Sequence, residues 1–309
     1  MKRRFRQLVI VLKKKMRLTL FSGCTKIQYH DILWGERRYG AHWFYRRMYM
    51  TKNEFDQLYQ EGSYEALAPY KVDNAVIMAA GLSSRFAPLS DTTPKPLLRV
   101  KGEIMIERQI RQLQEAGISE IYLVVGYKKE MFSYLSDKYG VHLLENPDFA
   151  VRNNNSSIYA ARHILGNSYI CSSDNYFMEN VFEPYVYRSY YAASYAKGTT
   201  GEYCLTTDIN GLITDVSVGG SDSWYMMGHV YWNREFSSRF VEFLEAEYDL
   251  PETKQMYWEN IYMKHIRQLP LYIRRYPEGI VREFDSLKEL CQFDPSYIPY
   301  LEKLIHEEE

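Results

Sequence analysis

The 309-residue chain has few cysteines and no long apolar run, and these absences exclude several classes of protein. Its four cysteines lie far apart and form no Cys-x-x-Cys pair, so neither a zinc knuckle nor a disulfide framework is expected. The apolar run Leu8–Leu12 ends at three consecutive lysines, and it is too short for a signal-peptide core or a membrane span. A reducing, cytoplasmic location fits this composition best.

A net charge of one sign is also missing, because 38 basic and 39 acidic side chains nearly cancel. Residues 1–50 nevertheless form a basic N-terminal arm, with 13 Lys and Arg against two acids. We expect this arm to be a loosely ordered appendage, a surface that touches anionic lipid or nucleic acid, or an ordered part of the fold. A stable nucleic-acid partner is not expected. Residues 51–72 are predicted to be a short helix and connector, and residues 73–309 a single folded domain.

From Asn74 onward, short apolar runs alternate with amphipathic segments, a pattern typical of a parallel sheet covered by helices on both faces. Strands are predicted at 75–80, 121–125, 141–144 and 168–175, and helices at 106–116 and 128–139. Later elements are a hairpin (203–207 and 213–218), a strand at 226–232, helices at 234–248 and 254–266, two short strands within 272–284, and a helical tail from 286. The predicted fold class is α/β, with a doubly wound, mostly parallel, Rossmann-like sheet and a small β-rich subregion.

The turn after the first predicted strand has the composition of a phosphate-binding loop. Its small residues, whose backbone N–H groups can face an anion, are Ala80, Gly81, Ser83 and Ser84. Arg85 adds a planar guanidinium, and Lys95 adds a point charge on a stiff segment between two prolines. Neither the P-loop pattern nor G-x-G-x-x-G is present. The alternative interpretation is an ordinary strand-to-helix turn with two solvated cations.

The stretch AAGLSSRFAPLSDTTPKPLL, residues 79–98, resembles the signature of nucleotidyltransferases that activate sugar phosphates and related alcohol phosphates. Within that family the chain is most similar to bacterial CTP:phosphocholine cytidylyltransferases, over residues 145–159, 168–177, 256–262 and 281–290. The resemblance covers roughly residues 74–290, and it implies a nucleotidyltransferase domain at 73–309. One departure is Ser83, where most members carry a second glycine.

The resemblance also implies roles for individual residues. Asp174 and Asp285 match the family's magnesium ligands, and a hard cation that bridges phosphates needs only one or two carboxylates. Together with Arg85 and Lys95 they form the implied catalytic set, and the implied cofactor is Mg²⁺. The implied nucleotide-binding residues are the loop residues above together with Asn154 and Ser157. Taken alone, Asp174 fits a helix N-cap, and the Asn154 segment fits an Asx turn and helix cap.

Aromatic residues are abundant, with 29 Tyr, 14 Phe and 5 Trp. A quaternary ammonium group cannot donate a hydrogen bond, so its recognition requires ring faces and nearby carboxylates. Tyr203, Tyr257 and Trp258, with Glu202 and Glu259 beside them, have the residue types of such an aromatic cage. Core packing is the alternative for each ring.

The expected reaction is transfer of CMP from CTP to phosphocholine, which gives CDP-choline and pyrophosphate. CTP and phosphocholine are therefore the expected small-molecule partners. No general base is required, because the second pKa of a phosphomonoester is about 6. Two alternatives remain at this point: a nucleotidyltransferase for a sugar 1-phosphate or another alcohol phosphate, and a non-catalytic regulatory protein that senses nucleotides.

Overall fold

The computed structural model describes residues 50–307, and the chain divides into two compact units, Met1–Ser63 and Tyr64–Glu309. The described part of the first unit contains helix α4 (Lys52–Gln60), which begins with a capping box between Thr51 and Glu54. Residues 64–72 belong to the second unit rather than to a connector, since Leu67 and Tyr70 are buried. Most of the predicted basic arm lies outside the described residues.

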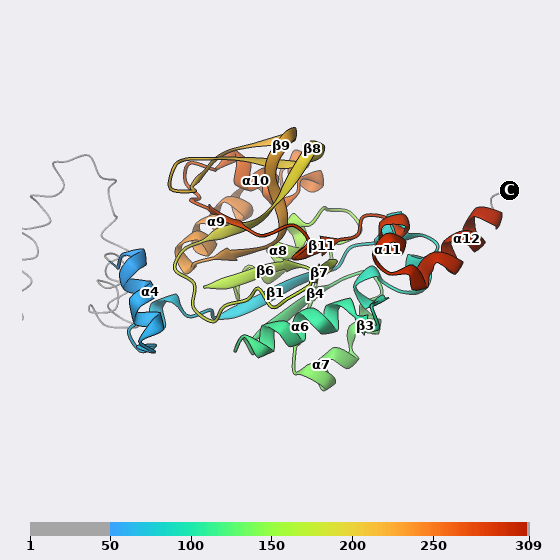
Figure 1. Cartoon of the computed structure of the whole chain (residues 1–309), viewed down its shortest axis with the longest axis horizontal. Coiled ribbons are helices and arrows are strands. Elements are labelled where there is room, and N and C mark those ends of the chain that lie inside the picture. The colour runs from blue at the N-terminus through green and yellow to red at the C-terminus, as the bar shows by residue number, and fades with distance from the viewer. Residues whose placement is uncertain (1–49, 308–309) are drawn as a thin grey trace, which may run out of the picture. The chain divides into compact units, whose positions relative to one another are not determined.

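A seven-stranded sheet forms the centre of the second unit, in the order β10-β8-β9-β6-β1-β4-β5 (Figure 1). The strands β1 (Asn74–Ala79), β4 (Ile121–Val125), β5 (His142–Glu145) and β6 (Ser168–Ser172) are mutually parallel. Within this seven-stranded sheet, β9 runs antiparallel to both of its neighbours, β6 and β8, and the other pairs are parallel. The predicted α/β class and the mostly parallel, Rossmann-like sheet are therefore confirmed.

Helices cover both faces of the sheet, as the apolar runs in the strands require. Helices α6 (Met105–Glu115) and α7 (Tyr134–Tyr139) lie on one face, and α8 (Asn155–Ala161), α9 (Arg234–Glu247) and α10 (Trp258–Lys264) lie on the other (Figure 1). Alternate residues of β1 enter different cores, because Ala75 and Ile77 pack in the α6 core and Val76 packs in the α8–α10 core. None of the helices within residues 50–307 is long and apolar enough to cross a membrane.

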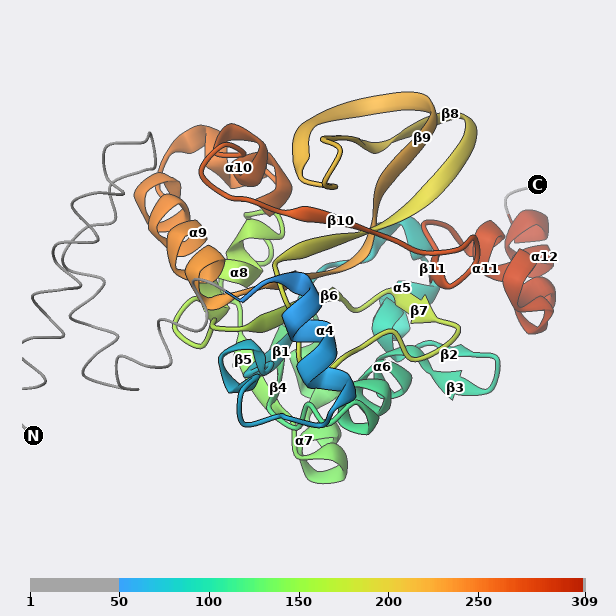
Figure 2. The same ribbon diagram turned by 60° about the vertical axis from the view of Figure 1, so that its left-hand side comes forward.

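The hairpin is much longer than the sequence predicts. Its strands are β8 (Tyr190–Thr207) and β9 (Ile213–Trp232), and their outer halves form a curved ribbon (Figure 2). Residues 197–202 and 217–223 are rich in Gly, Ser and Thr and largely exposed, so they lack the alternation of apolar and polar residues that identifies a strand. Several register irregularities interrupt the ladder between the two strands.

The remaining elements are short. A 3₁₀ turn (Lys129–Phe132) precedes α7, and another (Pro251–Gln255) precedes α10, where the sequence predicts continuous helices. Strand β10 (Tyr272–Arg275) pairs with β8, β11 (Val281–Glu283) pairs with β7 (Asn175–Phe177), and β2 (Arg99–Val100) pairs with β3 (Glu103–Ile104). Helices α5 (Leu89–Thr92), α11 (Leu287–Phe293) and α12 (Ile298–Glu307) complete the chain.

Candidate active site

Residues 80–85, here called the glycine loop, directly follow the carboxyl end of β1. Ala80 is buried, and its carbonyl accepts a hydrogen bond from Tyr127 N–H at 3.1 Å. The space where a Gly81 Cβ would stand is open, with no atom within 4 Å. Ser83 has φ +52°, the left-handed region that glycine adopts most readily, and Ser84 begins a 3₁₀ turn (Ser84–Phe86). The serine thus keeps the left-handed backbone that favours glycine at this position.

Lys95 packs against Phe86, the residue that follows Arg85, and its ammonium contacts Asp174. Its side chain is almost wholly buried, and Nζ lies 3.0 Å from Asp174 Oδ2 and 4.9 Å from the centre of the Phe86 ring. The two flanking prolines restrict the backbone of this segment. The structure therefore brings together two residues that only the family resemblance had linked.

Asp174 and Asp285 lie at the same end of a small antiparallel sheet. Asp174 directly precedes β7, and Asp285 follows β11 by two residues, while Asn175 and Glu283 form the last pair between the strands. Arg85 reaches this end from the glycine loop, because its Nη2 lies 2.8 Å from Asp285 Oδ1. All four predicted catalytic residues therefore meet where the glycine loop faces the β7–β11 sheet.

Glu283 adds a third carboxylate that the sequence analysis did not select, although it stands two residues before Asp285. The Asp174 carboxylate raises the pKa of Glu283 above its usual range, and Asp285 acts in the same direction. Burial and the Asp285 charge likewise raise the pKa of Glu202. The site thus concentrates negative charge, and a bound cation would relieve it.

These residues fit a magnesium ion. Within residues 50–307 no group of three or more His, Cys, Asp or Glu side chains is arranged to hold a metal. Mg²⁺ commonly takes only one or two carboxylates and completes its shell with water and substrate phosphates, so Asp174 and Asp285 are sufficient. Among the described residues, neither polar atom of the buried Asn175 side chain has a hydrogen-bond partner. That amide, which the sequence analysis also missed, is suited to a ligand beside Asp174.

Asn154 and Ser157, two of the predicted nucleotide-binding residues, already have protein partners. Asn154 Oδ1 accepts from Trp258 N–H at 2.8 Å, and its amide donates to Glu259 Oε2 at 3.4 Å. Ser157 is buried, and its hydroxyl accepts from the Asn146 amide at 3.2 Å. Asn154 therefore ties its loop to the start of α10. A nucleotide contact by either residue stays a prediction.

Glu259 is buried beneath the predicted cage and faces two donors. Its Oε1 accepts from the Tyr191 hydroxyl at 3.0 Å, and its other oxygen faces Asn154. Burial raises the pKa of Glu259 to about 7. The carboxyl is therefore partly neutral near physiological pH, which weakens it as a counter-ion for a cationic substrate.

The prediction that Trp258 lines an aromatic cage is wrong. Its side chain is only 1% exposed. Its ring stacks on that of Tyr191, with 5.7 Å between the ring centres, and makes an edge-to-face contact with Trp232, with 5.2 Å between the centres. The first residue of α10 points into the core between the sheet and α9, together with Ile261 and Tyr262. Trp258 therefore packs as a core residue.

Tyr203 and Tyr257 remain available for a ligand and share one organising residue. Tyr257 is 46% exposed, and its backbone N–H donates to Asn260 Oδ1 at 2.8 Å. The Asn260 amide in turn donates to the Tyr203 hydroxyl at 3.1 Å. Tyr225 lies in the electrostatic field of Glu202, because burial and then the charge of Glu202 raise the pKa of Tyr225. Asn260 was missed because a helical asparagine beside tyrosines has no characteristic sequence pattern.

Comparison with known proteins decides the family. Residues 75–181 match the MobA-like NTP transferase domain. The chain is 40% identical over 229 residues to 2-aminoethylphosphonate cytidylyltransferase of Lancefieldella rimae, covering 73% of this chain and 93% of that protein. It is 34% identical over 215 residues to choline-phosphate cytidylyltransferase of Streptococcus pneumoniae, covering 70% and 94%. The chain belongs to this cytidylyltransferase family.

The solved structures agree with that assignment. CTP:phosphocholine cytidylyltransferase of Streptococcus pneumoniae superimposes with a TM-score of 0.69 at 34% identity, covering 72% of this chain and 97% of that one. A glucose-1-phosphate thymidylyltransferase from Bacillus anthracis, at 16% identity and a TM-score of 0.60, shares the fold. This cytidylyltransferase is thus an enzyme that acts on phosphate-bearing substrates, and the predicted family and enzyme class are confirmed.

Proposed function

We propose that this cytidylyltransferase transfers CMP from CTP to a small acceptor that carries a phosphate or phosphonate at one end and a cationic nitrogen at the other. Phosphocholine is the first candidate, with CDP-choline and pyrophosphate as products. The observation that carries the proposal is the meeting of Lys95 with Asp174, and of Arg85 with Asp285, beside the glycine loop. Two cations and two carboxylates placed in this way suit a polyphosphate and its metal ion.

The reaction is a displacement at phosphorus. An oxygen of the acceptor attacks the α-phosphorus of CTP and forms a new P–O bond, while the bond from the α-phosphorus to the bridging oxygen breaks and pyrophosphate leaves with its electron pair. A phosphomonoester is largely dianionic at neutral pH. Catalysis therefore depends on positioning and charge neutralisation rather than on a general base.

The position of each side chain supports a distinct role. Lys95 is buried, so its charge acts at low dielectric, which suits the α-phosphate and the incoming oxyanion. Arg85 is largely exposed at the loop, which suits the β and γ phosphates and departing pyrophosphate. Asp174 and Asp285 would hold Mg²⁺, which when bound supplies positive charge to the phosphate oxygens.

The acceptor's nitrogen separates two candidates. Tyr203, Tyr257 and Glu202 support phosphocholine, since ring faces and a carboxylate attract a trimethylammonium group. The burial of Trp258 removes one ring from that cage and favours a second candidate, 2-aminoethylphosphonate, whose primary ammonium can donate hydrogen bonds. Relatives of this chain carry the names of both activities.

A panel of substrates tests the proposal. Mg²⁺-dependent pyrophosphate release is measured for four nucleoside triphosphates, each with phosphocholine, phosphoethanolamine, 2-aminoethylphosphonate and glucose 1-phosphate. Phosphocholine, phosphoethanolamine and 2-aminoethylphosphonate each carry a cationic nitrogen and are here grouped as amine-bearing acceptors. We expect CTP with one of these three to give the largest kcat/KM. Turnover of glucose 1-phosphate tenfold faster than of every amine-bearing acceptor would contradict the proposed acceptor and support the sugar-phosphate alternative.

A further inference from the structure

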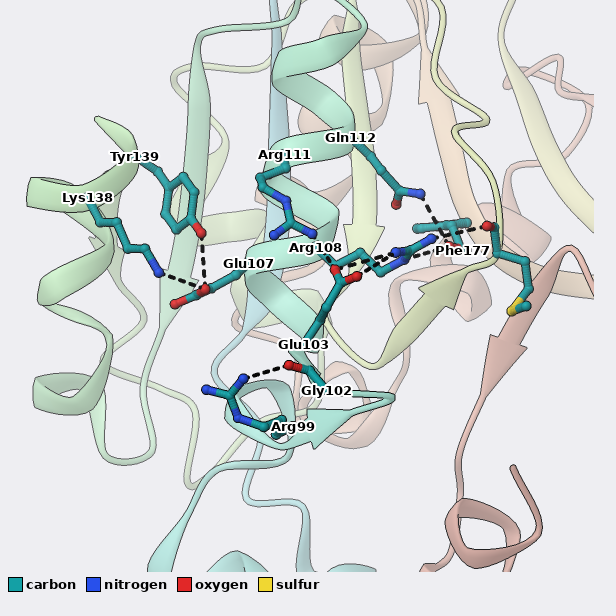
Figure 3. A network of polar contacts seen from close by, with 11 residues as sticks. Arg99, Gly102, Glu103, Glu107, Arg108, Arg111, Gln112, Lys138, Tyr139 and Phe177 are labelled. Atoms are coloured by element: carbon teal, nitrogen blue, oxygen red, sulfur yellow. Dashed lines mark hydrogen bonds and ion pairs between the residues drawn. The ribbon is translucent and has the colours of Figure 1, made fainter. Parts of the chain in front are cut away.

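Side chains of α6 donate hydrogen bonds to the main chain on both sides of Asp174, and Figure 3 shows two of them, Arg108 and Gln112, pointing toward Phe177. The Gln109 amide of α6 donates to the carbonyl of Ser172, at the end of β6, at 3.1 Å. Arg108 Nε donates to the Phe177 carbonyl at 2.9 Å, and its Nη2 donates to the Met178 carbonyl at 3.1 Å. Asp174 lies between these anchor points, two residues after the first and three before the second.

Gln112, also on α6, is a further buried donor to this segment. The Gln112 amide donates to the Phe177 carbonyl at 3.2 Å, and both glutamine side chains are buried. A carbonyl that loses its partner away from water keeps its full desolvation penalty. The bonds to the Ser172 and Phe177 carbonyls therefore hold residues 172–177 more firmly than bonds at the surface would.

Arg108 has its own orientation fixed from two directions. Its guanidinium lies 3.3 Å from the Glu103 carboxylate and 4.8 Å from the centre of the Tyr176 ring. Arg111 pairs with the same glutamate from the next turn of the helix (Figure 3). Arg108 thus contacts three consecutive residues, 176–178, whereas Arg111 pairs with Glu103.

Strand pairing connects the segment held by α6 to Asp285, the second aspartate. β7 pairs with β11 in a fixed register, in which Phe177 faces Val281 and Asn175 faces Glu283. Asp285 follows that strand by two residues. Helix α6 itself is anchored to the central sheet by Ile106, Ile110 and Leu113, which are fully buried. A shift of β7 relative to α6 would therefore move the chain that carries both carboxylates.

We propose that Arg108, Gln109 and Gln112 are positioning residues for the transferase site. They set the place of Asp174, and through β11 that of Asp285, by holding main-chain carbonyls, and they touch no substrate. This inference rests on the proposed function, because that function gives the two aspartates their role. A displacement of about 1 Å in a catalytic group can reduce a rate by about a hundredfold.

The test compares Arg108→Met with Arg111→Met in the full-length chain. Both changes remove a guanidinium that pairs with Glu103, but only the first removes donors to β7. We expect Arg108→Met to lower kcat by about tenfold to a hundredfold and to raise the apparent Mg²⁺ activation constant several-fold, with the KM for CTP little changed. Arg111→Met should leave each of these values within about twofold of wild type.

A second readout does not depend on turnover. In the ligand-free protein, amide hydrogen exchange of residues 172–178 and 281–285 should accelerate in Arg108→Met and stay unchanged in Arg111→Met. Gln112→Met, which keeps the side-chain volume, should give a smaller change in the same segments if Arg108→Met folds poorly. Arg108→Lys, which keeps one donor, should restore part of the kcat.

Equal kcat, equal Mg²⁺ activation and equal exchange in the Arg108 and Arg111 variants would overturn the proposal. So would loss of activity in Arg108→Met accompanied by a general increase in exchange over the whole domain, since that indicates a purely structural role. If the wild-type chain transferred CMP to no acceptor, the proposed function would fail, and the exchange comparison would still decide whether Arg108 fixes residues 172–178.

Discussion

The Lys95 ammonium lies 3.0 Å from Asp174 Oδ2, which joins two segments separated by 79 residues. One segment follows the glycine loop and the other follows β6, so this single contact connects the glycine loop with the proposed metal site. The cation is also buried, and a buried charge without its partner is costly. Pairing with Asp174 therefore fixes the Lys95 ammonium at the site, where the proposed reaction requires a positive charge.

Replacing Lys95 by methionine keeps the length of the side chain and removes its charge. We expect kcat for CMP transfer to fall by about a hundredfold to a thousandfold, as when one preorganised donor to a transition state is deleted. Steady-state pyrophosphate release measures this. Lys129→Met is the matched control, because Lys129 forms an exposed ion pair with Glu145 and its loss should leave kcat within about twofold. Similar losses in both variants would show that Lys95 has no special role.

Asp174→Asn and Asp285→Asn should each abolish most of the activity. Asp285→Asn should lower the thermal midpoint little, because carboxylates near one site repel each other when no metal is bound. Asp174→Asn should lower it, because the buried Lys95 ammonium then loses its partner. Activity titrated with Mg²⁺, together with thermal unfolding, checks these statements. Asp137→Asn, on the exposed surface of α7, is the control. Near wild-type turnover of either variant at saturating Mg²⁺ would remove that residue from the proposed ligands.

Glu259 makes a prediction about stability and pH. Because burial raises its pKa from 4.5 to about 7, the ionised form is disfavoured in the folded state. Its contribution to the free energy of unfolding should decline between about pH 4.5 and pH 7, with a slope of at most about 1.4 kcal/mol per pH unit, and stay constant above that range.

The measurement is the difference in unfolding free energy between the wild type and Glu259→Gln across pH 4 to 8. A difference is required because His229, whose pKa burial lowers to about 3, contributes stability in the opposite sense over an overlapping range. Glu252→Gln, an exposed glutamate in the same region, should show no such pH dependence. A Glu259→Gln difference that does not vary with pH would contradict the proposed effect of burial.

Trp258 and Tyr257 should respond oppositely to replacement by leucine. Trp258→Leu removes a core ring and should lower the unfolding free energy by about 2 to 4 kcal/mol, with no selective change in the KM for the acceptor. Tyr257→Leu should cost little stability and raise the KM for the acceptor several-fold, because a cation–π contact contributes about 0.5 to 2 kcal/mol. The KM for CTP should not change in either variant. An increase in the KM for the acceptor in Trp258→Leu alone would contradict the core role of Trp258 and support the original prediction that it lines the aromatic cage.

Local patterns predicted much of the fold. The strands β1 and β4 and the helix α6 were placed to within a residue, because fully buried strands and amphipathic helices have distinct apolar periods. The outer halves of β8 and β9 were missed since their residues are exposed and small, and only pairing across the hairpin makes them strands.

The site was predicted less evenly. The family resemblance supplied the four residues proposed to be catalytic, which spacing alone could not have linked across the chain. It could not supply the helical phase at the start of α10, and that phase decides whether Trp258 or Tyr257 faces solvent. The contacts of Arg108 and Gln109 end on main-chain carbonyls, and a carbonyl acceptor has no sequence signature.

The most direct test of the account is a single competition reaction. CTP, Mg²⁺ and equimolar phosphocholine, 2-aminoethylphosphonate and glucose 1-phosphate are incubated with the wild-type chain, and the products are identified by phosphorus NMR. We predict a cytidine product linked to an amine-bearing acceptor, pyrophosphate in equal amount, and no CDP-glucose. Formation of CDP-glucose as the main product, or of CMP without any linked product, would contradict the account.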